Sequence, residues 1–287
     1  MSDDQDRRGA QPGMRLGPYL LGESLGKGGM GVVFRATHVG DASEVAVKVL
    51  RKELTADEEH RARFEREARS AARVDDPTAV RVHDVGVERD LPYIAMELLH
   101  GETLAELFRR EAPMDVERAT ALLCPIGACL ARAHAAGVVH RDVKPSNVFI
   151  ERAKGAETPR LLDFGIAKLE VPGGERLTVT GTSLGSPAYM APEQVTSSKT
   201  AAAASDQFAF GVLLYEAVSG VLPHEAPSPQ LLALLKCVRP ARPLSEVRDD
   251  LPAGFEEVVM RTLELDPAAR FVDFEALLAA LARWSAV

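Results

Sequence analysis

The chain has 287 residues, 46% of them hydrophobic and 26% charged, a composition typical of globular proteins and a length that suggests two packed lobes. A formal net charge of −8 argues against nucleic acid as a main partner, because an acidic surface repels the phosphate backbone. The sequence has no apolar run long enough to cross a bilayer and no secretory signal, so we expect a cytoplasmic protein without a membrane segment.

The first part of the chain is predicted to be mostly β-sheet. Residues 1–15 are polar and charged, and we expect a disordered lead-in there. Alternating apolar residues then predict strands, which we place at residues 19–25, 32–37, 44–50, 81–87 and 91–98. A helix is predicted between them, over residues 57–74, where alanine, arginine and glutamate recur at helical spacing.

The second part is predicted to be mainly helical. Amphipathic or strongly apolar segments predict helices, which we place at residues 103–110, 116–136, 208–219, 231–238, 255–263 and 274–284. The polar stretch between them, over 140–205, shows β-like runs only at 148–150 and 161–162. Irregular segments of this length are uncommon in compact domains and are usually functional.

Glycines gather between the first two predicted strands, in the pattern Gly26-x-Gly28-x-x-Gly31. Such glycines let backbone N–H groups approach phosphates, although a simple glycine-rich hairpin would look the same. A dinucleotide-binding fold would place a helix directly after the glycines. A strand is predicted here instead, which excludes that fold.

A single lysine, Lys48, lies within the apolar strand at 44–50. Strand lysines usually point to solvent, but a lysine in a cleft can bind phosphate as a point charge. The second interpretation requires a carboxylate partner. Glu67 in the predicted helix is the best candidate, and Glu65 on a different face of that helix is its rival.

Three further motifs follow in a fixed order. The run HRDVKPSN occupies residues 140–147, DFG occupies 163–165 and APE occupies 191–193. With these motifs, the chain from about residue 19 to 281 resembles the eukaryotic-like (Hanks-type) protein kinases, and in particular the bacterial serine/threonine kinases. The resemblance implies transfer of the γ-phosphoryl group of ATP to serine or threonine hydroxyls of proteins, in signal transduction.

The resemblance also implies the fold and the catalytic residues. We expect the α+β bilobal kinase fold, with a small, mostly antiparallel β N-lobe carrying one αC helix (about 16–98) and a larger, mainly α-helical C-lobe (about 99–287). Asp142 would accept or orient the proton of the acceptor hydroxyl, and Lys144 would neutralise the γ-phosphate. Lys48 would bind the α- and β-phosphates, held by Glu67.

Metal and nucleotide contacts are implied in the same way. Asn147 and Asp163 would bind Mg²⁺, or alternatively Mn²⁺, as hard oxygen ligands. Gly26, Gly28 and Gly31 would lie over the phosphates. The other residues expected to contact the nucleotide are Leu25, Val33, Ala46, Lys48, Met96, Glu97, Leu99 and Phe149.

Regulation and structural support are also implied. Arg141 would pair with a phosphate on the activation segment, which runs from Asp163 to Glu193. We predict autophosphorylation of this segment at Thr178 and Thr180. An unmodified, hydroxyl-rich loop is the alternative. Glu193 is expected to pair with Arg270. Three supporting residues are expected elsewhere: Asp206 bonded to the catalytic-loop backbone, His140 in packing and backbone bonding, and His134 in the core.

Two alternatives belong to other classes of protein. A pseudokinase is a signalling scaffold that has usually lost the lysine or one of the two aspartates, yet Lys48, Asp142 and Asp163 are all present. A small-molecule phosphotransferase lacks the full segment from DFG to APE, which is present here. Substrates, upstream signal and oligomeric state are not predicted.

Overall fold

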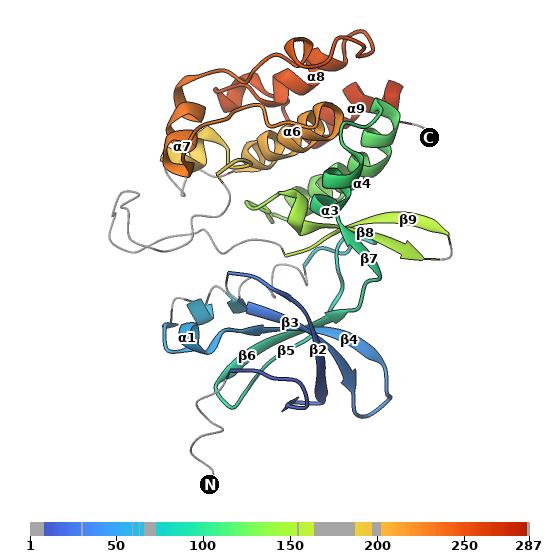
Figure 1. The fold of residues 1–287 in the computed structure, drawn as a ribbon, viewed down its shortest axis with the longest axis vertical. Coiled ribbons are helices and arrows are strands. Elements are labelled where there is room, and N and C mark those ends of the chain that lie inside the picture. Colours follow the sequence, from blue (N-terminus) through green and yellow to red (C-terminus); the bar gives the residue numbers. More distant parts are fainter. Residues whose placement is uncertain are drawn as a thin grey trace. The chain divides into compact units, whose positions relative to one another are not determined.

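The computed structural model describes residues 9–29, 31–58, 60–62, 64–65, 73–153, 155–163, 187–196 and 202–285. The chain divides into two compact units (Figure 1). The first comprises Met1–Asp75 and Val80–His100, and the second comprises Asp76–Ala79 and Gly101–Val287. The division falls near residue 100, and the short segment Asp76–Ala79 belongs to the second unit.

The first unit contains a six-stranded antiparallel sheet, in the order β1-β2-β3-β4-β6-β5 (Figure 1). Five strands were predicted, and the structure confirms them with shifted ends. The strands are β1 Arg15–Leu16, β2 Tyr19–Lys27, β3 Gly31–His38, β4 Glu44–Leu50, β5 Val82–Glu88 and β6 Leu91–Glu97.

The sheet begins earlier than the sequence predicted. Arg15 of β1 pairs with Leu20 of β2, and Met14 packs against the buried core of the sheet. These residues fall within the lead-in expected over 1–15, of which residues 1–8 lie outside the described part of the chain. A two-residue edge strand carries no alternation, so it left no periodic signal in the sequence.

The two faces of β4 differ in character. Val45, Val47 and Val49 face the core that β1–β4 and β6 share, and each is at most 5% exposed. Ala46 and Lys48 occupy the opposite face, because successive strand residues alternate. Burial of the three valines fixes the register of β4, and the side chain of Lys48 therefore points to the face opposite the core.

The helical segment after β4 is described only in part. α1 spans Lys52–Thr55, which was not predicted. Within the helix predicted over 57–74, the described residues 58, 60–62, 64 and 65 are helical, and Phe64 is 1% exposed. Glu67 lies outside the described residues.

The second unit is mainly helical. α4 packs against α6 and α9, and α6 packs against α8 (Figure 1). α6 is buried over most of its length, as predicted for residues 208–219. The helices are α3 Leu104–Glu111, α4 Val116–Ala135, α5 Pro192–Thr196, α6 Ala203–Ser219, α7 Pro229–Val238, α8 Phe255–Thr262 and α9 Phe274–Leu281.

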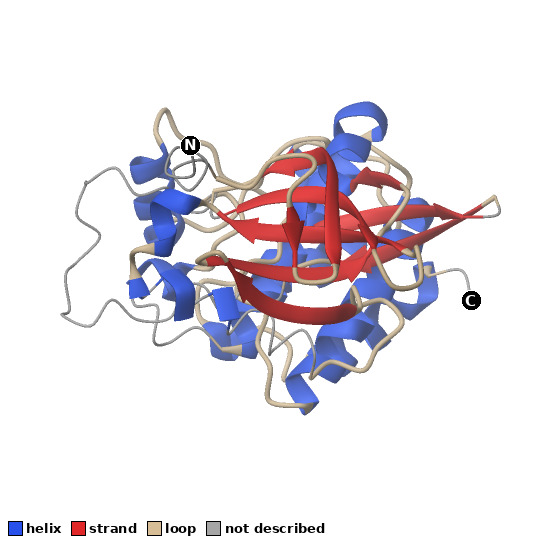
Figure 2. Ribbon diagram, turned by 90° about the horizontal axis from the view of Figure 1, so that it is seen from below, coloured by secondary structure: helices blue, strands red, loops and turns tan. Residues whose placement is uncertain are grey.

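A three-stranded antiparallel sheet accompanies these helices, and its strands are drawn in red in Figure 2 with those of the first unit. It consists of β7 Gly101–Thr103, β8 Val148–Ala153 and β9 Ala156–Leu161. The β-like runs predicted at 148–150 and 161–162 are therefore parts of a longer hairpin. Among the described residues, no helix has the length and apolar character needed to cross a membrane.

His224 is buried in the second unit and makes the fold sensitive to pH. Its side chain bonds the carbonyl oxygen of Arg239 through Nε2 (3.1 Å), while its buried Nδ1 has no hydrogen-bond partner. Burial lowers the pKa of His224, the bond to Arg239 opposes this, and the charge of Lys236 adds to it. The folded protein therefore disfavours the protonated imidazole relative to the unfolded chain.

We expect His224 to reduce stability in acid. Below about pH 6.5 the unfolded chain binds a proton at this position that the folded chain resists, so the free energy of unfolding falls by up to about 1.4 kcal/mol per pH unit. His224→Phe should remove this contribution. Urea unfolding at pH 7.5 and 5.5 measures it, with His83→Phe on the exposed face of β5 as the control. Equal pH dependence in wild type and His224→Phe would contradict the expectation.

Candidate active site

The catalytic loop is fixed by one buried carboxylate at the start of α6. Asp206 is 1% exposed and accepts hydrogen bonds from the backbone N–H groups of His140 (2.8 Å) and Arg141 (2.7 Å). This confirms the role predicted for Asp206. His134 was predicted to be a core residue, but its Nε2 also bonds Asp206 (2.8 Å). The carboxylate thus holds the chain just before Asp142.

Two of the predicted catalytic and metal-binding side chains, those of Lys144 and Asn147, bond Asp142. Lys144 Nζ lies 2.6 Å from Asp142 Oδ2. Asn147 Nδ2 donates to the same oxygen (3.1 Å) and to the backbone carbonyl of Asp142 (2.9 Å). Because both amide protons of Asn147 are used in this way, its Oδ1 is left to face other groups as a hard oxygen donor.

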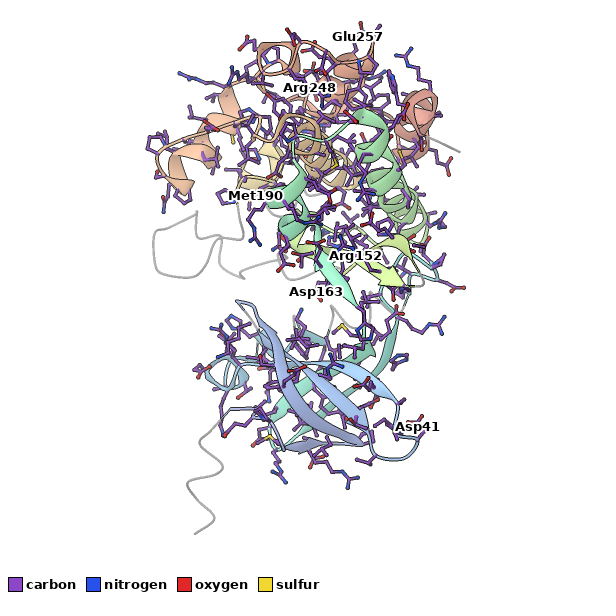
Figure 3. All side chains as sticks on the ribbon, turned by 45° about the vertical axis from the view of Figure 1, so that its right-hand side comes forward. Asp41, Arg152, Asp163, Met190, Arg248 and Glu257 are labelled. Atoms are coloured by element: carbon purple, nitrogen blue, oxygen red, sulfur yellow. The ribbon has the colours of Figure 1, made fainter. Side chains whose placement is uncertain are left out.

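Backbone bonds place Asp163 next to this loop. β9 pairs with β8 up to Leu161, and the N–H of Leu162 then donates to the carbonyl of Asn147 (2.8 Å). His140 Nε2 donates to the carbonyl of Leu162 (3.0 Å), while its Nδ1 accepts the N–H of Asp142 (3.3 Å). His140 therefore bonds backbone on both sides, as predicted. Asp163 follows at a φ of +47°, in the left-handed region, and is labelled in Figure 3.

The first unit gathers the predicted nucleotide-binding residues on one face of its sheet. Val33 is the cross-strand partner of Lys48, and Ala46 is the partner of Met96. Directly opposed residues share a face, so these four side chains lie on the side opposite the valine core. Ile94, the other partner of Lys48, joins them. The arrangement combines an apolar surface with one cation.

The glycines between β2 and β3 have different structural reasons. A Cβ at Gly31 would stand 2.7 Å from the carbonyl oxygen of Val49, so only glycine fits there. At Gly26 a Cβ would meet nothing within 4 Å, and at Gly28 its nearest atom would be the Gly31 carbonyl at 3.8 Å. Packing among the described residues therefore gives no steric reason for glycine at positions 26 and 28. The N–H of Gly28 donates to the carbonyl of Gly31 (2.8 Å) and closes the turn.

The remaining predicted contacts occupy several places. Leu25 lies in β2 beside a register shift and is 44% exposed. Glu97 ends β6, and its carboxylate accepts the N–H of Arg81 (2.6 Å). Leu99 is half-buried, and within the described ranges no backbone hydrogen bond involves it. Phe149 is half-buried in β8 of the second unit.

The guanidinium of Arg141 is only partly satisfied. Within the part of the chain that the structure describes, its Nε and Nη1 are buried without a hydrogen-bond partner, and its backbone has a φ of +66°. Burial lowers the pKa of the guanidinium, and the nearby Asp206 carboxylate opposes this shift. A buried guanidinium without a partner is costly, so an anion brought to this position would be bound favourably.

The predicted ion pair between Glu193 and Arg270 is present. Arg270 Nη1 and Nη2 contact the two carboxylate oxygens at 2.8 and 2.9 Å, and the arginine side chain is fully buried. Burial alone would raise the pKa of Glu193, but the hydrogen bonds and charge of Arg270 hold it below its ordinary value. Gln194, which was not predicted, bonds the carbonyl of Arg141 (3.1 Å) and so joins this segment to the catalytic loop.

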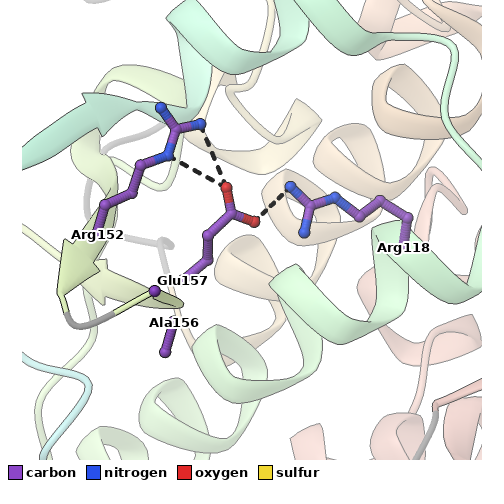
Figure 4. A pocket seen from close by; sticks show the side chains of 5 residues that line it. Arg118, Arg152, Ala156 and Glu157 are labelled. Atoms are coloured by element: carbon purple, nitrogen blue, oxygen red, sulfur yellow. Dashed lines mark hydrogen bonds and ion pairs between the residues drawn. The ribbon is translucent and has the colours of Figure 1, made fainter.

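One pocket of the described residues lies elsewhere in the second unit. It measures about 530 Å³ and is lined by Arg118, Arg152, Gly155, Ala156 and Glu157 (Figure 4). Glu157 accepts from Arg118 (2.6 Å) and Arg152 (3.2 Å), and these bonds lower its pKa. The arginines are already neutralised, and none of these residues was predicted to act in catalysis.

The described residues hold no group of three or more histidine, cysteine or acidic side chains that could bind a metal. A metal cage made by the protein alone is therefore not found in the described ranges. Mg²⁺ is commonly held by one or two carboxylates together with substrate phosphates. The carboxylate of Asp163 and the free Oδ1 of Asn147 fit that kind of site.

The fold and the catalytic loop define a protein kinase. The sequence profile described as "Protein kinase domain" matches residues 19–280. That match covers most of the chain, which therefore belongs to the protein kinase family.

Relatives and solved structures agree with this assignment. The chain is 38% identical to serine/threonine-protein kinase PknH of Mycobacterium tuberculosis, over 94% of this chain and 42% of the relative. It is 37% identical to serine/threonine-protein kinase pkn3 of Myxococcus xanthus, over 92% and 49%. The crystal structure of the M. tuberculosis PknI kinase domain matches with a TM-score of 0.73 and 28% identity, covering 96% of this chain and 99% of that one. The chain spans less than half the length of the curated relatives it matches.

Proposed function

We propose that this chain transfers the γ-phosphoryl group of ATP to serine or threonine hydroxyls of proteins, as a cytoplasmic signalling kinase. The observation that carries the proposal is the bonding of Lys144 and Asn147 to the Asp142 carboxylate, at 2.6 and 3.1 Å. Phosphoryl transfer depends mainly on positioning and on neutralising charge. A carboxylate with a cation and an amide fixed beside it provides both.

ATP with Mg²⁺, or alternatively Mn²⁺, supplies the transferred group and the charge that neutralises it. Asn147 and Asp163 would hold the metal, and Lys48 would bind the α- and β-phosphates. Asp142 would accept the proton of the acceptor hydroxyl, and Lys144 would stabilise charge on the transferred group. Glu67, which lies outside the described residues, is proposed as the partner of Lys48.

The nucleotide base would bind the apolar face formed by Val33, Ala46 and Met96. These residues share that face with Lys48, as their register requires. The backbone between Glu97 and Leu99 would read the edge of the adenine, with Leu25 and Phe149 as further apolar contacts. Gly26 and Gly28, where a side chain would meet no close atom, would lie over the phosphates, and Gly31 would hold the turn close to β4.

The direct test is transfer of radiolabelled phosphate from ATP, with Mg²⁺, to a generic protein acceptor. Wild type should label the acceptor on serine or threonine, as phosphoamino-acid analysis would show, and Lys48→Met should not. Lys52→Met, four residues further on in α1, is the matched control and should keep the wild-type rate. A binding scaffold of the pseudokinase type would instead bind nucleotide without labelling any acceptor, which would refute the proposal.

We further propose autophosphorylation at Thr178 and Thr180, which lie outside the described residues. The support is Arg141, whose buried Nε and Nη1 have no hydrogen-bond partner among the described residues. A phosphate with a charge near −2 would pair with this guanidinium and order the segment that carries it. Mass spectrometry of the purified protein should find phosphate on one or both threonines in wild type and on neither in Lys48→Met. An active wild type with both threonines unmodified would contradict this.

A further inference from the structure

One lysine of the second unit is buried and donates to backbone that directly precedes the APE motif. Lys236 in α7 is 0% exposed, and its Nζ bonds the carbonyl oxygens of Pro187 (3.0 Å) and Ala188 (2.5 Å). The same ammonium lies 4.9 Å from the centre of the Phe208 ring in α6. Lysine is rarely buried so completely, because its charge loses its hydration. The complete burial of Lys236 therefore needs a structural or functional explanation.

The segment that Lys236 contacts has little regular structure of its own. Residues 187–189 form a turn, in which the N–H of Met190 donates to the carbonyl of Pro187 (3.3 Å). The hydroxyl of Tyr189 donates to Glu216 of α6 (2.7 Å). The path of this turn is thus set by side chains of α6 and α7 that reach out to it.

The ammonium of Lys236 in α7 and the carboxylate of Glu216 in α6 both bond the turn at residues 187–189. Lys236 fixes the carbonyl directions of Pro187 and Ala188, and Glu216 fixes the side chain of the next residue, Tyr189. A flexible stem ending in three donors can satisfy two carbonyls at once, which an apolar side chain cannot. Removing it would leave both oxygens to find other partners and would let the turn move.

We propose that Lys236 is a positioning residue for the protein substrate. This inference rests on the proposed function, and on the expectation from the kinase resemblance that the segment from DFG to APE forms the surface that receives the acceptor protein. The two hydrogen bonds of Lys236 given above go to the turn at residues 187–189. Loss of Lys236 should therefore weaken binding of the acceptor and leave nucleotide binding unchanged.

The test separates positioning from stability. Lys236→Met keeps the length and packing of the side chain and removes the donors and the charge. The change removes the cost of desolvating a buried ammonium, which offsets the cost of leaving two carbonyl oxygens without this donor, so the melting temperature should stay within about 4 °C of wild type. With the best peptide from a serine/threonine peptide array, the KM for peptide should rise about tenfold. The KM for ATP and the rate of ATP hydrolysis without peptide should not change.

Two further variants sharpen the result. Lys236→Arg keeps the donors, so its peptide KM should lie nearer to wild type than that of Lys236→Met. Arg239→Met removes an exposed cation at the end of α7 and should behave as wild type. Unchanged peptide KM in Lys236→Met would overturn the inference, as would a fall in melting temperature with equal losses toward peptide and ATP. A wild type that labels no peptide would instead refute the proposed function.

Discussion

Asp142→Asn is expected to lower the rate of phosphoryl transfer at least ~100-fold while the protein stays folded. Asparagine has the size of aspartate, and the backbone carbonyl of residue 142 would still accept from Asn147. The neutral amide cannot take a proton from the acceptor hydroxyl. It also presents no charge to Lys144, whose Nζ now lies 2.6 Å from the carboxylate. Initial rates with radiolabelled ATP, together with a thermal melt, measure both effects.

Asp249→Asn is the matched control for this experiment. Asp249 is exposed, and the same chemical change there should leave the rate unaltered. If Asp142→Asn kept activity within about threefold of wild type, the carboxylate would have no part in proton transfer or charge stabilisation. The mechanism proposed for the Asp142 loop would then be wrong.

Arg270→Met is expected to lower the free energy of unfolding by about 3–5 kcal/mol, because it leaves Glu193 buried without its partner. Arg270 is fully buried and makes two bonds to the Glu193 carboxylate. It also donates to the carbonyls of Glu264 (2.9 Å) and Ala204 (2.8 Å). Equilibrium unfolding in urea measures the change.

Two comparisons make this prediction specific. Arg242→Met breaks an exposed pair with Glu246 and should cost at most about 1 kcal/mol. The double variant Arg270→Met/Glu193→Gln should lose less than the sum of its single changes, because each single change already breaks the pair. A loss at Arg270 no larger than at Arg242 would show that the pair does not stabilise the fold.

The lowered pKa of Glu193 also sets a pH window. A carboxylate with a depressed pKa in the folded state contributes stability above the unfolded value near 4.5 and loses it as pH falls through the folded pKa. Wild type should therefore lose stability in this acid range more steeply than Glu193→Gln. Unfolding curves at pH 6 and pH 4 would show the difference.

Long strands and helices with regular spacing could be predicted from the sequence. β4 and α6 were found because a run of alternating or wholly apolar residues leaves a strong signal. β1 and β7 have two and three residues and left none. Their positions depend on pairing with β2 and β8, which lie further along the chain.

The catalytic loop could be predicted because its polar residues are contiguous and unusual in composition. Lys236 could not, since a lysine on an amphipathic helix normally faces solvent. In α7 the pattern is reversed: Leu234 and Val238 are 63% and 71% exposed, while Lys236 is buried. The carbonyl oxygens that accept from the buried ammonium belong to the turn at residues 187–189. Because this turn is distant from α7 in the sequence, the residues of α7 alone do not predict the burial.

The segment Asp76–Ala79 is covalently part of the β-rich half but is held by the helical half. Its buried Asp76 pairs with Arg132 of α4, and the carbonyl of Thr78 accepts the N–H of Leu161 (2.7 Å). A protease cut or a chimaera junction at His100 would therefore not yield two intact halves. In the N-terminal fragment, the carboxylate of Asp76 would lack Arg132. In the C-terminal fragment, β9, which leads to Asp163, would lack the carbonyl of Thr78 as an acceptor. A graft from a related kinase would have to exchange this four-residue insert together with the helical half.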